Sequence, residues 1–169
     1  MARGAIAAKL AGAPEPPIPD IPIARESRGA FVSLHEDGGD LRGCIGHVAS
    51  DRPLGEVIRQ IAVSAAQSDP RFPPVAPEEL PDLRLEISVL SEPRYVATTD
   101  LRGIVIGRDG LLVRRGRAQA VLLPQVATEH GFGPEAFLDA VCHKAGLAAG
   151  SWREPDTQVF TFTADIFVE

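Results

Sequence analysis

Rings, thiols and lysines are scarce in this chain of 169 residues, which has one Trp, one Tyr, two Cys and only two Lys. With few rings available, the core has to be filled by the aliphatic residues that dominate the 44% hydrophobic fraction. A chain of this length buries roughly 70% of the surface that it exposes when unfolded, so it needs neither a disulfide nor a metal to fold. We expect one domain spanning residues 1–169, or at most two small lobes around a shared core.

Long apolar runs are absent as well. The first residues, MARGAIAAKLAGAP, contain no continuous apolar segment and no cleavage context of a secretory signal. No other run approaches the roughly 20 apolar residues that a membrane-spanning helix needs. We therefore expect a cytoplasmic protein that binds no membrane, and in that compartment Cys44 and Cys142 would both be reduced.

Surplus positive charge is the third absence. The chain has 17 Lys and Arg against 23 Asp and Glu, which gives a formal net charge of −6. Broad contact with a nucleic-acid backbone depends on clustered basic residues, so this balance argues against it, although a local basic pocket stays open.

The motifs of common cofactor and metal sites are also missing. There is no glycine-rich phosphate loop, Walker motif or nucleophile elbow. Cys44 and His47 have the spacing of a metal-binding pair, and Cys142 with His143 offers a second pair. Adjacent residues of a helix point to different sides, however, and a closed zinc site needs four well-placed ligands. We predict no metal and no cofactor.

What is present is an interspersed series of helical and strand-like patterns. A helix is predicted over Ala2 to Leu10, followed by a Pro-rich segment, residues 13–22, that should be extended and wrap the surface. Leu41 to Val48 should pair with Ala30 to His35 in a hairpin around the turn residues 37–40.

Further elements follow from periodicity and turn residues. The first is a helix from Pro53 to about Ser68 that Ser50 or Asp51 can cap, followed by a half-buried strand over Leu83 to Val89. A hairpin over Ile104 to Arg115, turning at residues 108–110, and a strand from Ala120 to Leu123 come next. Two helices then begin near Pro124 and at Pro134, and a strand over Gln158 to Phe167 closes the series. Because several strands are joined by hairpins, the sheets should be mixed or antiparallel with packed helices, in an α+β fold rather than a doubly wound one.

The hexapeptide Leu-Arg-Gly-Cys-Ile-Gly at residues 41–46 is the segment that most suggests chemistry. Glycine inside a strand indicates a bulge or the close approach of another backbone or a ligand. Exposed backbone amides and the charge of Arg42 would favour a thiolate at Cys44, whereas cysteine base rates favour a small side chain packed in a core. Arg42 could clamp a carboxylate or phosphate, or form a structural salt bridge.

Five further residues are candidates for a functional role, and most of them also have a structural interpretation. Asp69 and Arg71 lie two residues apart in a stiff Pro-rich loop, as ligand-binding groups or as a surface ion pair. Glu86 is on the polar side of its strand and faces either a cleft or solvent. Gln125 follows a strand at a turn into a helix, where functional side chains are common. Lys144 ends a helix, where the helix dipole alone favours a cation.

Five blocks, taken in order, resemble the AMMECR-type domain, which is named after the AMME syndrome candidate gene product and whose prokaryotic members are called AmmeMemoRadiSam system protein A. The blocks are LRGCIG at 41–46, DPRFPP at 69–74, LEISVLS at 85–91, LLPQVA at 122–127 and CHKAGL at 142–147. The opening ARGAI and the closing FTADIFVE also fit. The resemblance therefore covers nearly the whole chain.

The resemblance implies an α+β fold with a larger and a smaller lobe and a cleft near the hexapeptide. The residues that match the family's motifs are candidates for catalysis at Cys44, Arg42, Glu86 and Lys144, and for ligand binding at Leu41, Gly43, Ile45, Gly46, Asp69, Arg71 and Gln125. The family has no established reaction. Its neighbouring genes imply Memo-like proteins and radical-SAM proteins as partners, with a small molecule or a nucleic acid as substrate.

Three functions remain open on the sequence alone. The first is an enzyme in which Cys44 is the nucleophile or radical partner and Arg42 binds an anionic group of the substrate. The second is a non-catalytic accessory subunit whose cleft holds a ligand or a segment of a partner. The third is an RNA-binding protein, which the acidic net charge disfavours.

Overall fold

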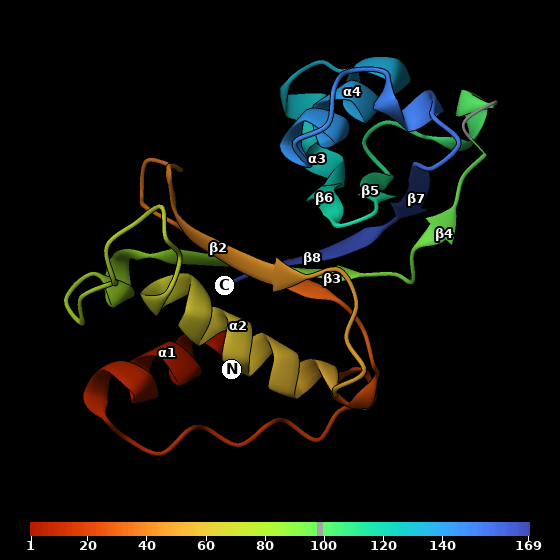
Figure 1. Ribbon diagram of the computed structural model, residues 1–169. Coiled ribbons are helices and arrows are strands. Elements are labelled where there is room, and N and C mark those ends of the chain that lie inside the picture. The colour runs from red at the N-terminus through yellow and green to blue at the C-terminus, as the bar shows by residue number, and fades with distance from the viewer. Residues whose placement is uncertain (98–99) are drawn as a thin grey trace. The chain divides into compact units, whose positions relative to one another are not determined.

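The computed structural model describes residues 1–97 and 100–169, and it forms two compact units (Figure 1). Unit 1 comprises residues 1–90 and 165–169, and unit 2 comprises residues 91–164. Each unit has its own hydrophobic core and its own four-stranded sheet. The antiparallel pairing within the sheets confirms the predicted α+β class.

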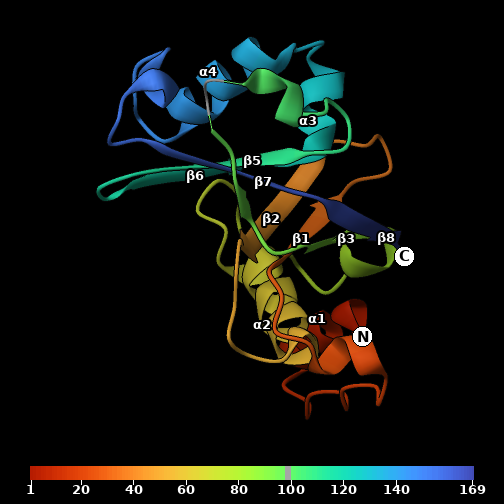
Figure 2. The same ribbon diagram turned by 90° about the vertical axis from the view of Figure 1, so that its right-hand side faces the viewer.

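Unit 1 is a sheet with two helices on one face. Its strands follow the order β2-β1-β3-β8, and they are β1 (Ala30–His35), β2 (Leu41–His47), β3 (Arg84–Leu90) and β8 (Ala164–Val168). Helix α2 (Leu54–Gln67) packs on the sheet and α1 (Ala2–Ala11) packs beside α2, as the two views in Figures 1 and 2 show. Residues 13–21, between α1 and the short helix η1 (Pro22–Arg25), have no regular structure and are mostly exposed.

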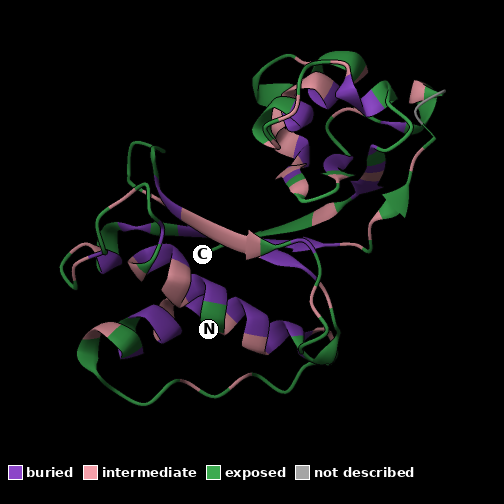
Figure 3. Cartoon of the chain, viewed as in Figure 1, coloured by how far each residue is buried: buried purple, intermediate pink, exposed green. Residues whose placement is uncertain are grey.

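The apolar stripe of α2 explains how this helix seats on the sheet. Its predicted core residues are all buried, and they are Leu54, Val57, Ile58, Ile61, Ala62 and Ala65. Figure 3 shows α2 largely in the colour of buried residues. These side chains form one cluster with Val32 and Leu34 of β1 and with Leu85 of β3. The apolar residues that repeat with the helical period in the sequence therefore form a large part of the core of unit 1.

The start of α2 differs from the sequence-based prediction. Neither Ser50 nor Asp51 caps the helix, because Pro53 occupies the N-cap position and makes no side-chain bond. The first helical amide, that of Leu54, instead donates to the carbonyl oxygen of Glu26 at 2.8 Å. A backbone acceptor from a distant segment thus replaces the side-chain cap.

Two glycines of β2 sit where no side chain fits. A Cβ atom on Gly43 would lie 2.3 Å from the carbonyl oxygen of Ala65 in α2. A Cβ atom on Gly46 would lie 2.3 Å from the ring of Phe31 in β1. The close approach that these glycines predict is therefore made by the backbone of α2 and by an aromatic ring of the neighbouring strand.

Unit 2 packs short helices against its own sheet. The strands follow the order β4-β7-β5-β6, and they are β4 (Arg94–Tyr95), β5 (Gly110–Arg115), β6 (Ala118–Leu122) and β7 (Gln158–Phe162). The helices are α3 (Pro124–Glu129) and α4 (Pro134–Lys144), with single turns η3 (Leu101–Gly103) and η4 (Ser151–Arg153). Phe137, Leu138 and Val141 of α4 are fully buried in the core of this unit.

The hairpin predicted over Ile104 to Arg115 was wrong. Residues 104–109 form no strand, and β5 pairs with β6 instead, around a turn in which Gly116 has a φ of 57°. The carboxylate of Asp109 accepts a hydrogen bond of 2.8 Å from the amide of Val105. That bond closes residues 105–109 into a loop and removes the amide from any strand ladder.

The single closing strand predicted over Gln158 to Phe167 was also wrong, because β7 and β8 belong to different sheets. The break is at Thr163, whose amide donates to Ser91 Oγ at 2.9 Å and whose carbonyl oxygen accepts from the amide of Ser91 at 2.9 Å. These bonds hold together the two points at which the chain enters and leaves unit 2. None of the helices in the two described ranges is long and apolar enough to cross a membrane.

Replacing Gly43 should test the close approach of β2 to α2. Gly43→Ala is expected to lower the free energy of unfolding by about 1–3 kcal/mol, because its Cβ would press on a backbone oxygen that cannot swing away. Gly38→Ala is the control, since a Cβ there meets nothing within 4 Å. Urea unfolding followed by circular dichroism measures both. Equal stabilities of the two variants would contradict the close approach.

Candidate functional site

The side chains of Cys44, Ser33 and Glu86 form a row across three neighbouring strands. Cys44 of β2 pairs with Ser33 of β1, and Ser33 pairs with Glu86 of β3. Side chains alternate between the two faces of a sheet. Because Gly43 and Leu85 face the helices, this row lies on the opposite face of the sheet in unit 1.

The thiol of Cys44 has a polar neighbour. Ser33 Oγ donates a hydrogen bond of 3.2 Å to Cys44 Sγ. Ser33 is buried, whereas Cys44 is half-buried. The sulfur is therefore hydrogen-bonded to a buried hydroxyl group, in a residue that is itself partly exposed.

The backbone of Cys44 is held by the loop that follows α2. The amide of Cys44 donates to Asp69 Oδ2 at 2.9 Å, and the carbonyl oxygen of Cys44 accepts from Arg71 Nη2 at 3.2 Å. Asp69 and Arg71 therefore bracket the peptide units on either side of the cysteine. The sequence placed these residues 25 or more positions apart, and the fold brings them into contact.

Asp69 is a buried carboxylate with a full set of donors. Besides the Cys44 amide, it accepts from the Arg71 backbone amide at 3.1 Å, from Arg71 Nε at 2.9 Å and from Arg71 Nη2 at 2.6 Å. The hydrogen bonds from the Arg71 side chain, against the opposing effect of burial, hold the pKa of Asp69 far below its usual range. Asp69 is therefore ionised at neutral pH.

Arg71 is the exposed cation beside the thiol. Its side chain is 54% exposed, although Asp69 fixes its guanidinium from one side. The hydrogen bond to Asp69 raises the pKa of Arg71, and the nearby side chain of Cys44 contributes to the same rise. The charge next to Cys44 is thus permanent and directed.

Arg42 lies in a different environment, and its contacts are those of a structural salt bridge. It is buried, and its guanidinium donates to both carboxylate oxygens of Glu79 at 2.9 and 3.2 Å and to the carbonyl oxygen of Pro73 at 2.9 Å. The bond from Arg42 lowers the pKa of Glu79, whose carboxylate also accepts from the amide of Ala76 at 2.6 Å. Arg42 therefore fastens residues 73–79 to β2.

The remaining candidates from the sequence are spread over both units. In β2, Leu41 is exposed, Ile45 packs against the core, and Gly43 and Gly46 are in the close contacts described above. Gln125 in α3 and Lys144 at the end of α4 belong to unit 2. Within residues 1–97 and 100–169, no three His, Cys, Asp or Glu side chains are grouped so that they could hold a metal ion.

Two residues of the site were not predicted from the sequence. Ser33 is the one hydroxyl within the otherwise apolar centre of β1, and that interruption was the available signal. Glu79 has no such signal, because it lies among other acidic and proline residues of a loop.

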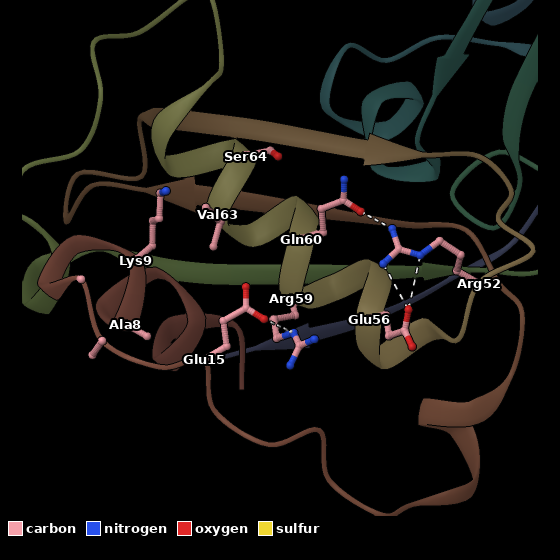
Figure 4. A pocket seen from close by; sticks show the side chains of 11 residues that line it. Ala8, Lys9, Glu15, Arg52, Glu56, Arg59, Gln60, Val63 and Ser64 are labelled. Carbon is pink, nitrogen blue, oxygen red and sulfur yellow. Dashed lines mark hydrogen bonds and ion pairs between the residues drawn. The ribbon is translucent and has the colours of Figure 1, made fainter.

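A hollow of about 690 Å³ lies elsewhere in unit 1, between the last turn of α1, residues 12–15 and α2 (Figure 4). Two of its arginines are paired with carboxylates of the same hollow. Arg52 bonds to Glu56 at 3.1 and 3.3 Å, and Arg59 forms an ion pair with Glu15 at 3.0 Å. These two pairs neutralise four of the charged side chains that line the hollow, and Lys9 is the fifth.

Removing the Asp69 carboxylate should lower the stability of the protein by an amount that depends on pH. Asp69→Asn is expected to lower the free energy of unfolding by about 2 kcal/mol at neutral pH, because a buried charge-assisted bond is lost. The folded-state pKa lies below the unfolded value of about 4, so this contribution is complete above that pH and disappears as the pH falls further. Urea unfolding at several pH values should therefore show the two proteins converging in acid.

Asp100→Asn is the matched control for this experiment. Asp100 accepts from the Arg102 amide at 3.1 Å and from Arg102 Nε at 2.9 Å, the same pattern as Asp69 with Arg71, but it is exposed. Its replacement should change stability much less at every pH. A difference between wild type and Asp69→Asn that does not depend on pH would contradict the assignment.

Comparisons with known proteins identify the family of the chain. The family model of AMMECR1 matches residues 1–167. A protein of Methanothermobacter thermautotrophicus is 46% identical over 175 residues, a match that covers 100% of this chain and 91% of that protein. A protein of Thermococcus kodakarensis is 46% identical over 151 residues, covering 85% of this chain and 74% of that protein.

A solved structure supports the same relationship. The crystal structure of uncharacterized protein PH0010 from Pyrococcus horikoshii is similar with a TM-score of 0.92 at 41% identity, and the match covers 99% of this chain and 87% of that chain. Sequence and fold thus agree over nearly the full length, which confirms the resemblance that the five blocks predict. The chain belongs to the AMMECR1 family.

Proposed function

We propose that this member of the AMMECR1 family is an enzyme whose reaction runs through the thiol of Cys44. The observation that carries the proposal is the 3.2 Å hydrogen bond from Ser33 Oγ to Cys44 Sγ. A hydroxyl that donates to sulfur stabilises the thiolate, which is the nucleophilic form of cysteine. Cys142 shows the contrasting arrangement, since it is fully buried in an apolar core and burial raises its pKa.

Arg71 supplies the positive charge that the sequence analysis assigned to Arg42. The guanidinium of Arg42 is buried against Glu79 and Pro73, whereas that of Arg71 is half exposed beside Cys44. Arginine binds carboxylate and phosphate groups through a planar fork of donors. We therefore propose a substrate with an anionic group close to the carbon that the sulfur attacks.

The proposed step forms a bond between the sulfur of Cys44 and an electrophilic carbon of the substrate. The electron pair displaced from that carbon moves onto the carbonyl oxygen or leaves with a departing group. The thiol proton has to move away first. Side chains opposite one another on neighbouring strands are about 5 Å apart, so Glu86 lies one strand too far to reach the sulfur and would take the proton through Ser33. Gln125 and Lys144 are not needed for this step.

Alkylation should distinguish an activated thiol from a packed one. Iodoacetamide is expected to modify Cys44 of the native protein at neutral pH and to modify Cys142 only after unfolding in urea. Ser33→Ala and Arg71→Gln should each slow the modification of Cys44 by about tenfold, which is the kinetic equivalent of about 1.4 kcal/mol, the size of one bond to a charged group. Mass spectrometry of peptides at timed intervals measures the rates.

Arg102→Gln is the control for the arginine variant. It removes a guanidinium that bonds to Asp100 in the same pattern but lies in unit 2. Cys44 of this variant should be alkylated at the same rate as Cys44 of the wild-type protein. If Ser33→Ala and Arg71→Gln also react like wild type, or if Cys142 reacts first, the proposal of a thiol enzyme is wrong.

An accessory subunit is the second candidate function, and a feature of β8 favours it. This edge strand exposes three consecutive apolar side chains, Ile166, Phe167 and Val168, by 47%, 52% and 60%. Exposed apolar residues on an open strand edge are a surface that a partner can cover. The family resemblance implies a Memo-like or a radical-SAM protein as that partner.

Size-exclusion chromatography of this protein mixed with a Memo-like or a radical-SAM protein tests this second function. Co-elution is expected, and Phe167→Glu should abolish it without changing the alkylation rate of Cys44. Tyr95→Glu, which alters an exposed aromatic residue of unit 2, is the control and should leave the complex intact. Separate elution of wild-type protein from both partners would remove this candidate.

A further inference from the structure

A second polar hollow, of about 550 Å³, lies in unit 2. It is formed around β4, the loop before β5 and the end of β7, and it contains none of the residues of the Cys44 site. The side chains that matter for its chemistry are Arg94, Tyr95, Asp100, Arg108, Asp109 and Thr161. Its volume is in the range of small-molecule sites, which is roughly 300–1,000 Å³.

The hollow is lined by two arginines, Arg94 and Arg108, and by two carboxylates, Asp100 and Asp109. The buried carboxylate of Asp109 accepts from Arg108 Nε and Nη2, both at 2.8 Å, which fixes the guanidinium of Arg108. Burial opposes the ionised form of Asp109, but the bond from Arg108 lowers the pKa of this carboxyl, and the charge of Arg94 adds a smaller effect in the same direction. Asp100 is likewise paired, because it accepts from Arg102 Nε and Nη2, both at 2.9 Å. Both carboxylates therefore have an arginine, whereas within the described residues the side chain of Arg94 makes no hydrogen bond or ion pair. An anion would complete this arrangement.

An exposed aromatic ring stands beside these cations. Tyr95 is the only tyrosine of the chain, and it is 65% exposed. Its ring is held edge-to-face against Phe160, with 5.9 Å between the ring centroids and 78° between the planes. A fixed and solvent-facing ring next to cations is the combination on which nucleobases stack while their phosphates are bound.

The acidic net charge of the chain, which disfavours nucleic-acid binding, is unevenly distributed between the two units. Unit 2 contains eight Lys and Arg and eight Asp and Glu, and is neutral. Unit 1 contains nine basic and fifteen acidic residues, which is the whole net charge of −6. The acidic balance that disfavours nucleic-acid binding therefore describes unit 1 alone.

We propose that the hollow of unit 2 binds a nucleoside monophosphate, with the base stacked on Tyr95 and the phosphate bound by Arg94 and Arg108. Two sources carry this chemistry, a free nucleotide and the 5′-terminal nucleotide of an RNA strand. The site is separate from the Cys44 row and does not depend on the function proposed for it.

Isothermal titration calorimetry with AMP, adenosine and inorganic phosphate tests the proposal. AMP is expected to bind more tightly than either half alone, because stacking and phosphate binding act together. Tyr95→Ala and Arg94→Gln should each weaken AMP binding by about tenfold, while Tyr95→Phe keeps the ring and the affinity. Arg117→Gln is the control, since Arg117 is exposed and lies outside the hollow.

Two short single-stranded RNAs of one sequence, with and without a 5′-phosphate, identify the source. If the phosphorylated RNA binds more tightly than AMP and shows the same loss in Tyr95→Ala and Arg94→Gln, the ligand is an RNA end. If only AMP shows that loss, the ligand is a free nucleotide. The proposal is overturned if neither AMP nor the phosphorylated RNA binds at millimolar concentration. It is also overturned if the affinity is unchanged by both substitutions and by removal of the 5′-phosphate.

Discussion

The buried carboxylate of Asp69 is the interaction on which the arrangement at Cys44 depends. It joins a strand and a loop that are 25 residues apart in the sequence, because it binds the amide of Cys44 and three donors of Arg71. A buried carboxylate that loses its donors is costly, so the loop can adopt only conformations that supply them. The cysteine and the cation therefore have a fixed relationship before any ligand arrives.

Unit 2 uses the same device at its own hollow. The carboxylate of Asp109 is buried, binds an adjacent arginine through two bonds and also takes a backbone amide, that of Val105. In both places an aspartate has two tasks, since it closes a loop and fixes the guanidinium of a half-exposed arginine. The two sites that we propose thus rest on one physical principle, preorganisation of a cation by a buried anion.

The sequence allowed prediction of those features that depend on local patterns. The helical period from Leu54 to Ala65 and the alternation from Leu83 to Val89 each predict an element whose apolar side faces the core, and both elements are present. The hairpin at Ile104 to Arg115 failed because Asp109 bonds to Val105 and turns those residues into a loop. The choice between Arg42 and Arg71 could not be made from the sequence, because it depends on Glu79, a residue whose contact with Arg42 exists only in the folded chain. A local pattern identifies the hexapeptide, but tertiary contacts decide which arginine faces outward.

The paired bonds between Ser91 and Thr163 have a consequence for the order in which the protein is made. They close residues 91–164 into a loop whose ends meet, so unit 2 is an insertion between β3 and β8 of unit 1. The ribosome completes the whole of that insertion before it releases β8. Until then the first sheet has three strands, and β3 is its open edge. A nascent chain thus carries an unpaired strand edge for 74 residues of synthesis, and the docking of β8 is the last event that protects it from neighbouring chains.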